Sequence, residues 1–229
     1  MKVTILGTGV VGQTIASRLV ELHHQVVMGT RNPHETIQRT EPNQMTGTSF
    51  SEWHKKNSAV KLMAFNEAAN EADLVINATN GSVSLAVLKT VGKETLKGKV
   101  LLDVANPLDF SNGMPPSLAV CNTDSLAEQI QREFSETKVV KSLNTMNTVI
   151  MMHPVTIAGD HNVFVCGNDE NARQMVKDLL YSIGWKHENI LDLGDITAAR
   201  GTEMLLPVWL RLYGIFGHAN FNFHIQADK

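Results

Sequence analysis

Residues 2–12 read Lys-Val-Thr-Ile-Leu-Gly-Thr-Gly-Val-Val-Gly, an apolar run followed at once by glycines in the spacing G-x-G-x-x-G. Residues 2–6 predict a short strand, and the amphipathic stretch 13–22 predicts a helix that begins near Val10. Strand, glycines and helix in this order are typical of a dinucleotide-binding turn, in which backbone amides at the helix N-terminus face the phosphates. A glycine-rich turn without a ligand is the alternative.

Each glycine of this turn has a mechanical role if a dinucleotide binds there. Gly7 permits the tight turn, Gly9 lets the backbone approach a pyrophosphate, and Gly12 lets the helix pack closely on the strand. The predicted phosphate-binding residues are therefore Gly7, Thr8, Gly9, Val10, Val11 and Gly12.

The end of the next predicted strand, residues 25–28, indicates which dinucleotide binds. Proteins that bind NAD usually place Asp or Glu at this point, beside the free 2′-hydroxyl of the adenosine ribose. Here the strand runs into Gly29, Thr30, Arg31 and Asn32. A guanidinium binds a 2′-phosphate and stacks on adenine, so Arg31 predicts NADP(H), with Thr30 and Asn32 as further partners of that phosphate. The alternative is that Arg31 is an ordinary solvated charge.

Strand and helix patterns alternate along the rest of the first 143 residues. Strands are predicted at residues 60–63, 73–78, 100–104 and 138–143, and helices at 66–72, 82–91 and 125–134. Such alternation indicates an α/β protein with a doubly wound parallel sheet of the Rossmann type. The polar segment 32–57 is expected to form a short helix and a loop rather than core.

The pattern changes near Asn144, where methionines and Pro154 replace the regular periodicity. We expect a domain boundary there, between an NADP-binding Rossmann domain at residues 1–143 and a small C-terminal α/β domain at residues 144–229. The second unit is predicted to contain strands at 162–166 and 190–193, helices at 170–183 and 197–212, and an aromatic segment at 221–225. Its expected roles are the substrate pocket and contacts between subunits.

Polar side chains follow several of the predicted strands at the point where each strand ends. In a doubly wound sheet the ligand lies across the carboxyl ends of the strands, so these residues are candidates for binding it. Cofactor contacts are predicted from Ala78, Thr79, Asn80, Gly81, Ala105 and Asn106, and positioning of the reacting groups from Asn144, Thr145, Met146 and Asn147. For each of these residues an ordinary role in a turn is as compatible with the sequence as a role in binding, because Asn, Thr and Gly are common in turns.

The composition argues against several classes of function. A net charge of −3 without a dense cluster of Lys and Arg argues against a nucleic-acid or anionic-membrane partner. The two cysteines, Cys121 and Cys166, lie far apart, so neither a disulfide nor a zinc site is predicted. The nine histidines show no metal-ligand spacing. Only His153 is expected near the site, and a solvated loop position is its alternative.

No targeting or membrane segment is expected. Because the first strand begins at residue 2, we expect no removable signal peptide and a cytoplasmic protein. The most apolar C-terminal stretch, 204–216, is interrupted by Pro207 and Arg211 and is too short to span a bilayer, so it predicts a buried or interfacial helix.

Beyond these local patterns, the chain resembles the NADP oxidoreductase, coenzyme F420-dependent family along essentially its whole length. That family includes archaeal NADPH:deazaflavin oxidoreductases and the cytosolic domains of mammalian transmembrane metalloreductases. The residues that carry the resemblance are the glycine turn with Gly29-Thr30-Arg31, Val139-Val140-Lys141-Ser142-Leu143-Asn144-Thr145, Val165-Cys166-Gly167-Asn168-Asp169, Leu191-Asp192-Leu193-Gly194 and Ala199-Arg200.

The resemblance implies a Rossmann domain with a small C-terminal domain, a homodimer or other oligomer, and direct hydride exchange between NADP(H) and a deazaflavin. A transfer of this kind needs positioning and exclusion of water more than a strong acid or base. A site made of amides, threonines and methionines agrees with that need.

The chain departs from the archaeal members in the turns that would face the acceptor. Those members carry an Ile-Pro turn where Thr79-Asn80-Gly81 stands, a histidine at the place of Asn144, and a second basic residue where His34 and Glu35 stand. We expect NADP(H) binding to survive these changes. They leave open whether the acceptor is the deazaflavin, a flavin or another small molecule.

Two other functions are compatible with the first domain. A hydroxy-acid or imino-acid reductase needs a long helical second domain, for which the segment after Asn144 is short. The Lys and Asn of the hydroxy-acid enzymes are also not found at helical spacing after a glycine-rich helix start. A non-catalytic NADPH-binding sensor would use the apolar helix around Trp209 and Tyr213 as a partner surface, although a homodimer face is a commoner use of such a helix.

Overall fold

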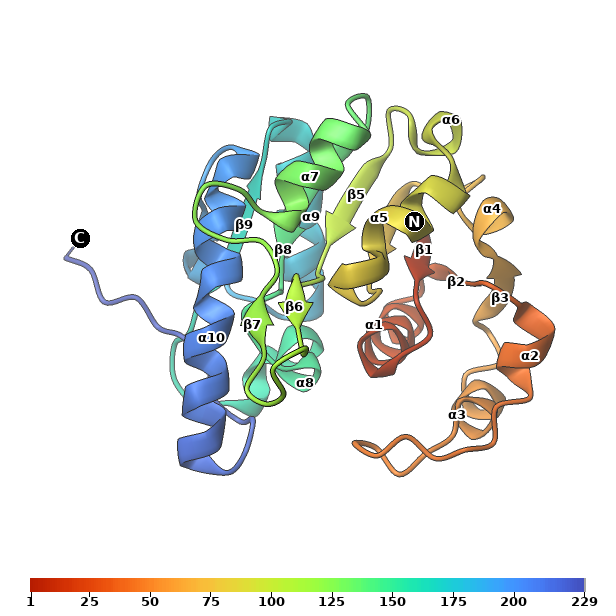
Figure 1. The fold of residues 1–229 in the computed structure, drawn as a ribbon, viewed down its shortest axis with the longest axis horizontal. Coiled ribbons are helices and arrows are strands. Elements are labelled where there is room, and N and C mark those ends of the chain that lie inside the picture. Colours follow the sequence, from red (N-terminus) through yellow and green to blue (C-terminus); the bar gives the residue numbers. More distant parts are fainter. Residues whose placement is uncertain (229) are drawn as a thin grey trace.

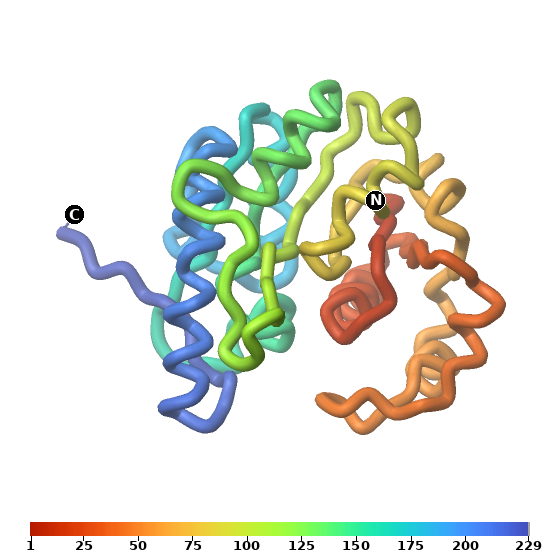
Figure 2. The backbone as a smooth tube through the Cα atoms, in the orientation of Figure 1, coloured from red at the N-terminus to blue at the C-terminus, as the bar shows by residue number. Residues whose placement is uncertain are grey.

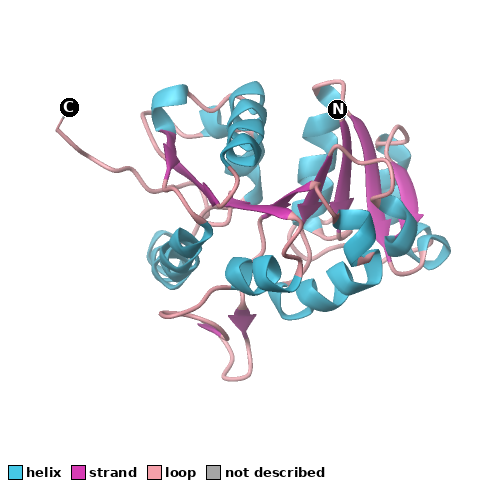
Figure 3. Ribbon diagram, turned by 90° about the horizontal axis from the view of Figure 1, so that it is seen from above, coloured by secondary structure: helices cyan, strands magenta, loops and turns pink. Residues whose placement is uncertain are grey.

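The computed structural model describes residues 1–228, and one eight-stranded sheet runs through it in the order β10-β9-β8-β5-β4-β1-β2-β3. Figure 1 shows the chain from its red N-terminal strand to its blue C-terminal helix, and Figure 3 shows helices on both faces of the sheet. The strands are β1 Lys2–Leu6, β2 Gln25–Thr30, β3 Lys61–Ala64, β4 Leu74–Asn77, β5 Val100–Asp103, β8 Lys138–Ser142, β9 Val163–Gly167 and β10 Ile190–Asp192.

The helices and one small hairpin complete the structure. The α-helices are α1 Val10–Glu21, α2 Pro33–Ile37, α3 Phe50–Lys56, α4 Phe65–Ala68, α5 Gly81–Val91, α6 Lys93–Leu96, α7 Leu126–Glu133, α8 Thr148–Met152, α9 Glu170–Ile183 and α10 Ala199–Phe216. Short 3-10 helices lie at Pro154–Thr156, His187–Asn189 and Ile196–Ala198. The hairpin of β6 Leu108–Asp109 and β7 Ser117–Leu118 lies apart from the main sheet (Figure 3).

From β3 to β8 every neighbouring pair of strands is parallel, as the alternation of strands and helices predicts. β9 is the exception, because it runs antiparallel to β8 with Lys141 opposite Cys166. β10 then pairs parallel to β9. The Rossmann fold is confirmed, with an antiparallel extension that the sequence patterns do not predict.

Alternate residues of the central strands enter two hydrophobic cores on opposite faces of the sheet. Ile5, Ile76 and Leu102 belong to the core that includes residues of α1, α8 and α9. Their neighbours along the same strands belong to the core with residues of α4, α5 and α7; these are Leu6, Val75 and Leu101. A strand buried on both faces reads as a continuous apolar run, which explains the composition of β4 and β5.

The backbone after residue 143 continues the same sheet, since β9 and β10 extend it beyond β8. A division of the chain into residues 1–143 and 144–229 therefore stays a prediction about function. What the structure shows is a single sheet whose last two strands come from the second segment.

Helix α10 is longer than the sequence predicts and continues through Pro207. A proline inside a helix removes one backbone hydrogen bond, but contacts on both sides hold this helix together. Glu203 and Leu206 are buried before the proline, and Trp209 stacks on Tyr213 after it, with 5.7 Å between the ring centroids. Within residues 1–228 no helix has the length and apolar character needed to cross a membrane.

Residues 218–225, which we call the C-terminal strap, return from α10 to the start of β9. Gly217 ends the helix with a φ of 68°, a left-handed value that favours glycine. Asn162 then holds the strap, because its N–H donates to the Phe223 carbonyl at 2.8 Å and its Oδ1 accepts from the Ile225 N–H at 2.7 Å. Beyond the strap the trace leaves the body of the molecule (Figure 2).

Candidate active site

The turn after β1 and the ends of β2 and β4 enclose a first cavity of about 520 Å³ at the carboxyl edge of the sheet. Ligands bind at this edge in doubly wound sheets. The predicted cofactor-binding residues that line the cavity are Gly7, Thr8, Gly9, Thr30, Arg31, Asn32, Ala78, Thr79 and Asn80.

The glycines of the first turn have the geometry that a bound pyrophosphate needs. Gly7 has a φ of 113°, and a side chain there would meet the Ala78 carbonyl oxygen at 2.6 Å. A Cβ on Gly12 would overlap the Gly7 carbonyl oxygen, so α1 packs directly against the turn. Gly9 has open space where its Cβ would be, and no side chain caps α1. The first amides of α1 therefore face room for a phosphate.

Two arginines face the same cavity without a carboxylate partner. The arginines that form ion pairs within residues 1–228 are Arg18, Arg132, Arg173 and Arg200. Arg31 is exposed at the end of β2. Arg39, beyond α2, donates to the Thr8 hydroxyl at 2.5 Å and lies over the Phe50 ring, 5.1 Å from its centroid. Glu35 also lines this cavity but forms no ion pair with either arginine within residues 1–228, so both guanidinium groups are available to a phosphate ester.

Arg39 is the one residue of this cavity's cationic pair that sequence reasoning missed. The sequence contains Arg39 as a second arginine in the polar segment after Arg31. Its separation from Arg31 along the chain gave no reason to place it at the first cavity. The short helix α2 turns the chain so that Arg39 faces the cavity. Asn32 caps this helix by accepting from the Glu35 N–H at 3.2 Å. Thr30 is buried, and its hydroxyl is hydrogen-bonded to that of Thr36 at 2.8 Å. A role for Thr30 and Asn32 in binding the phosphate stays a prediction.

A second cavity of about 480 Å³ adjoins the first and shares Ala78, Thr79 and Asn80 with it. Predicted site residues that line it are Val11, Gly81, Ala105, Asn106, Asn144, Met146 and Asn147. The residues around it include no Lys, Arg, His, Asp or Glu in the part of the chain that the structure describes. Val10, Gly12 and Thr145 line neither cavity.

Hydrogen bonds join the turns that surround the second cavity. Asn106 donates through Nδ2 to the Asn144 carbonyl at 2.8 Å, and Asn144 donates through Nδ2 to Asn106 Oδ1 at 3.0 Å. Asn80 caps α5 by accepting from the Ser82 N–H at 3.0 Å, and Asn147 caps α8 by accepting from the Val149 N–H at 2.8 Å. The turn chemistry considered for Asn80 and Asn147 is therefore present, and it fixes both residues beside the cavity.

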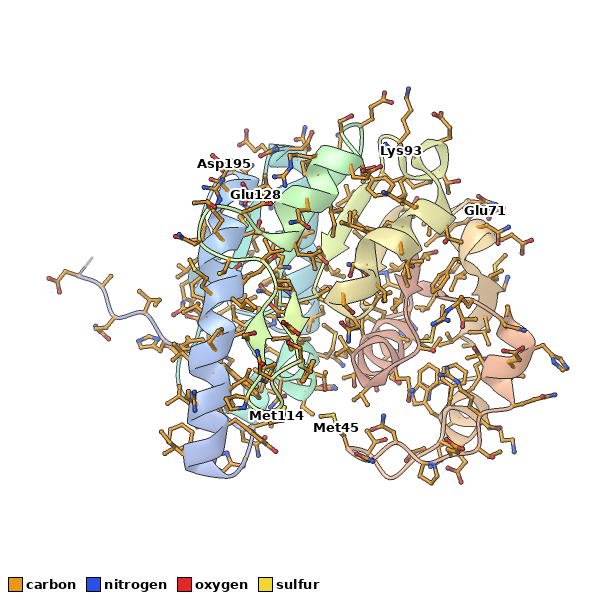
Figure 4. All side chains as sticks on the ribbon, viewed as in Figure 1. Met45, Glu71, Lys93, Met114, Glu128 and Asp195 are labelled. Atoms are coloured by element: carbon orange, nitrogen blue, oxygen red, sulfur yellow. The ribbon has the colours of Figure 1, made fainter. Side chains whose placement is uncertain are left out.

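Four segments reach the second cavity that sequence reasoning did not place there, the first being the β6 hairpin with Leu108 and Phe110. Met45, labelled in Figure 4 on the loop between α2 and α3, lines the cavity although its side chain is 82% exposed. Leu206 and Trp209 come from α10, and Ala219 comes from the C-terminal strap. Asn147 donates through Nδ2 to the Ala219 carbonyl, which attaches the strap to the cavity wall.

The positions of Trp209 and His153 in the structure differ from those that the sequence suggests. Trp209, considered as part of a partner surface, lines the second cavity and stacks on Phe221 of the strap with 5.0 Å between ring centroids. His153 lies at the C-terminal end of α8, beside α1, and lines neither cavity. Among the described residues no group of three or more His, Cys, Asp and Glu side chains is arranged to hold a metal ion.

Comparison with known proteins identifies the family. A family model described as NADP oxidoreductase coenzyme F420-dependent matches residues 2–107. The crystal structure of an F420-dependent NADP-reductase candidate from Arthrobacter sp. FB24 is 54% identical, with a TM-score of 0.93 over 99% of this chain and 100% of that one. The chain belongs to the NADP oxidoreductase coenzyme F420-dependent family.

More distant relatives lead to the same family. The F420-dependent NADP reductase of Methanocaldococcus jannaschii is 29% identical over 93% of this chain and 92% of its own length. Metalloreductase STEAP3 of Rattus norvegicus is 28% identical over 91% of this chain but only 38% of its own length. As a member of the F420-dependent family, the protein is an NADP-dependent oxidoreductase that acts on a small molecule.

Proposed function

We propose that the protein transfers hydride between NADPH and a planar deazaflavin, coenzyme F420, or a flavin-like ring bound in the second cavity. The observation that carries this proposal is the uncharged second cavity, which shares the wall formed by Ala78, Thr79 and Asn80 with the first. A nucleotide that extends from Arg31 across that wall would bring its nicotinamide ring to the edge of the second cavity.

The residues around the second cavity suit a reaction without acid or base catalysis. NADPH, when bound, would supply a hydride from its nicotinamide ring and become NADP⁺, and the proton that completes the reduced acceptor would come from solvent. The apolar side chains of Val104, Met146 and Met151 offer a dry surface to a flat ring, and the hydrogen-bonded pair Asn106 and Asn144 fixes the turns on which the ring would rest. Positioning and exclusion of water are the contributions that such a transfer requires from the protein.

The relatives support an acceptor of this class but do not name it for this chain. The Methanocaldococcus protein, whose name states its use of F420, is similar over nearly its whole length. The turns that face the second cavity here contain Thr79-Asn80-Gly81 and Asn144, in contrast to the Ile-Pro turn and histidine of archaeal members. For this reason we include flavins and other small acceptors in the proposal.

We also propose that residues 1–143 bind the nucleotide, that residues 144–229 complete the acceptor pocket, and that the protein is a homodimer. The argument for a dimer is the outer face of α10, where Val208, Tyr213, Ile215 and Phe216 are exposed. Exposed apolar residues gathered on one helix are typical of a subunit interface. Light scattering after size exclusion tests this part, and a monomer at micromolar concentration would contradict it.

The function itself is tested by mixing the purified protein with NADPH anaerobically and adding F420, FMN, FAD or riboflavin in separate experiments. Absorbance of both NADPH and acceptor is followed. We expect reduction of one ring class at the rate at which NADPH is consumed. Saturable NADPH binding without turnover of any of these rings would overturn the proposal in favour of an NADPH sensor or a reductase of an unrelated substrate.

A further inference from the structure

Lys141 is a charged residue in the middle of the sheet, and its side chain is completely buried. It lies on β8, directly after the buried apolar residues Val139 and Val140. Its ammonium group donates to Asp103 Oδ2 at 2.8 Å, to the Ala105 carbonyl at 2.5 Å, and lies 2.8 Å from Glu203 Oε1. All three of its N–H donors thus have an acceptor.

The two carboxylates connect Lys141 to elements on both sides. Glu203 of α10 accepts from the N–H groups of Leu126 and Ala127 at the start of α7, at 2.9 and 3.2 Å. Asp103 at the end of β5 accepts through Oδ1 from Asn77 Nδ2 at 2.7 Å. Burial would by itself lower the pKa of Lys141, but attraction to Asp103 and Glu203 raises the pKa above its ordinary value. Lys141 therefore stays charged at neutral pH.

From Asp103 the contacts continue to the wall that the two cavities share. Asn77 accepts through Oδ1 from the Thr79 hydroxyl at 2.6 Å and from the Thr79 N–H at 3.3 Å. Ala105 is held on both sides, because its N–H donates to Asp103 Oδ1 at 3.3 Å and its carbonyl accepts from Lys141. Thr79 and Ala105 both line the second cavity.

A buried ion cluster is weak evidence for stability, because well-packed apolar residues of similar volume are often as stable or more so. This cluster has a second feature besides stability. Its contacts lead to the carboxyl ends of β4, β5 and β8, which surround the second cavity. Loss of Lys141 would leave two buried carboxylates without their cation and free the Ala105 carbonyl. It would weaken the support of Thr79 indirectly, through Asp103 and Asn77, while the contact of Thr79 with Ser84 would remain.

We propose that Lys141 is a positioning residue that, through Asp103, Asn77 and Ala105, fixes the junction of the two cavities for the nicotinamide end of NADPH. This inference rests on the proposed placement of the nicotinamide at that junction. The adenosine end would lie at Arg31 and the glycine turn, and the network reaches the first cavity at the shared wall, through Thr79.

The test compares the binding of whole NADPH with that of adenosine 2′,5′-bisphosphate, which lacks the nicotinamide half. Lys141→Met removes the cation, and Asn77→Ala breaks the link to Thr79 while leaving the ion cluster in place. Val176→Ala, a buried change in α9 within the core on one face of the sheet, serves as a control for loss of stability alone. Fluorescence titration gives each Kd, and turnover with the best acceptor gives kcat and the deuterium isotope effect on hydride transfer.

In Lys141→Met and Asn77→Ala we expect NADPH affinity to fall about tenfold and kcat up to about 100-fold, because displacement of the ring by about 1 Å is enough for such losses. Affinity for the bisphosphate should change less than about twofold, since that half binds by its phosphates. The isotope effect should rise in both variants and stay constant in Val176→Ala.

Equal weakening of both ligands, or no weakening of either, would overturn the proposal and leave Lys141 with a purely structural role. If Lys141→Met does not fold, Asn77→Ala decides the matter alone. Failure of the wild type to reduce any acceptor would contradict the proposed function, yet the comparison of the two Kd values would still test the role of Lys141.

Discussion

The two cavities meet at Ala78, Thr79 and Asn80, yet the side chains around them differ in kind. The first holds Arg31 and Arg39 together with the uncapped start of α1, so it offers positive charge and backbone N–H groups. Among the described residues, the second is lined by amide, hydroxyl and apolar side chains and by no charged one. In the function proposed above, charge identifies the nucleotide, whereas shape and a largely apolar surface receive the acceptor.

This division has a physical reason. A phosphate needs charge-assisted hydrogen bonds, which are strong and directional. Hydride transfer adds negative charge to the acceptor ring, and the N–H donors of amide side chains can stabilise that charge. A carboxylate near the ring would oppose the charge and would have to be desolvated without a partner. The charged cluster around Lys141 lies below the surface of the second cavity and is connected to it by the Ala105 turn.

Among changes to residues that line the two cavities, the largest effect should come from Arg31→Ala, which tests the charged side of the comparison. Charge-assisted contacts to a phosphate contribute about 1.5–3 kcal/mol, so we expect kcat/KM for NADPH to fall about 100-fold while that for NADH stays the same. Arg39→Ala should have a smaller effect of about tenfold, because this arginine is already bonded to Thr8.

Steady-state kinetics with both nucleotides measures this preference. Lys186→Ala, which removes a surface cation paired with Asp160 at 2.7 Å, is the matched control. Equal losses with NADPH and NADH after Arg31→Ala would mean that the residue does not read the 2′-phosphate.

A middle-sized effect is expected from Trp209→Leu, which tests the uncharged side. The indole lines the second cavity, and loss of one aromatic contact costs about 0.5–1.5 kcal/mol beyond its area. We expect KM for the acceptor to rise about tenfold with an unchanged Kd for NADPH. Trp53→Leu, which alters an indole on α3 outside both cavities, should leave both constants as they are. An increase in the NADPH Kd alone would reverse the assignment of the two cavities.

The smallest effect concerns pH. Because no titratable side chain lines the second cavity, we expect the hydride-transfer rate at saturating NADPH and acceptor to change less than about twofold between about pH 7 and 9. Lys141 should not disturb this range. With its pKa raised in the folded protein, its stabilising effect is complete below the unfolded value of about 10.4 and is lost only at still higher pH.

Single-turnover stopped-flow measurements across this range give the rate. A bell-shaped profile would show that a residue near the ring gives or takes a proton, and the view of the second cavity as a neutral surface would fail.

Sequence reasoning worked best where the chemistry is local. The glycine turn, the end of β2 at Arg31 and the strand-end turns at Thr79, Asn106 and Asn144 are fixed by neighbours in the chain, and the structure brings them together at one edge. Parallel strands explain this success, because their carboxyl ends meet wherever the sheet forms.

Contacts between distant segments escaped prediction. Arg39 reaches Thr8 only after α2 has turned the chain, and Ala219 reaches Asn147 only after α10 and Gly217. One signal was present but not used, namely Lys141 and Asp103 as charges inside strands expected to be buried. A buried charge requires a partner, so two of them on neighbouring strands predict each other.

The C-terminal strap also determines how far this chain can be altered at its end. Ala219 forms part of the cavity wall, and Phe221 covers Trp209, whereas the residues after Ile225 lead away from the body of the molecule (Figure 1). A tag or protein fused after Ile225 would therefore lie away from the second cavity. Truncation of the chain before Ala219 would remove both Ala219 and Phe221, and the second cavity would then be open to water on that side.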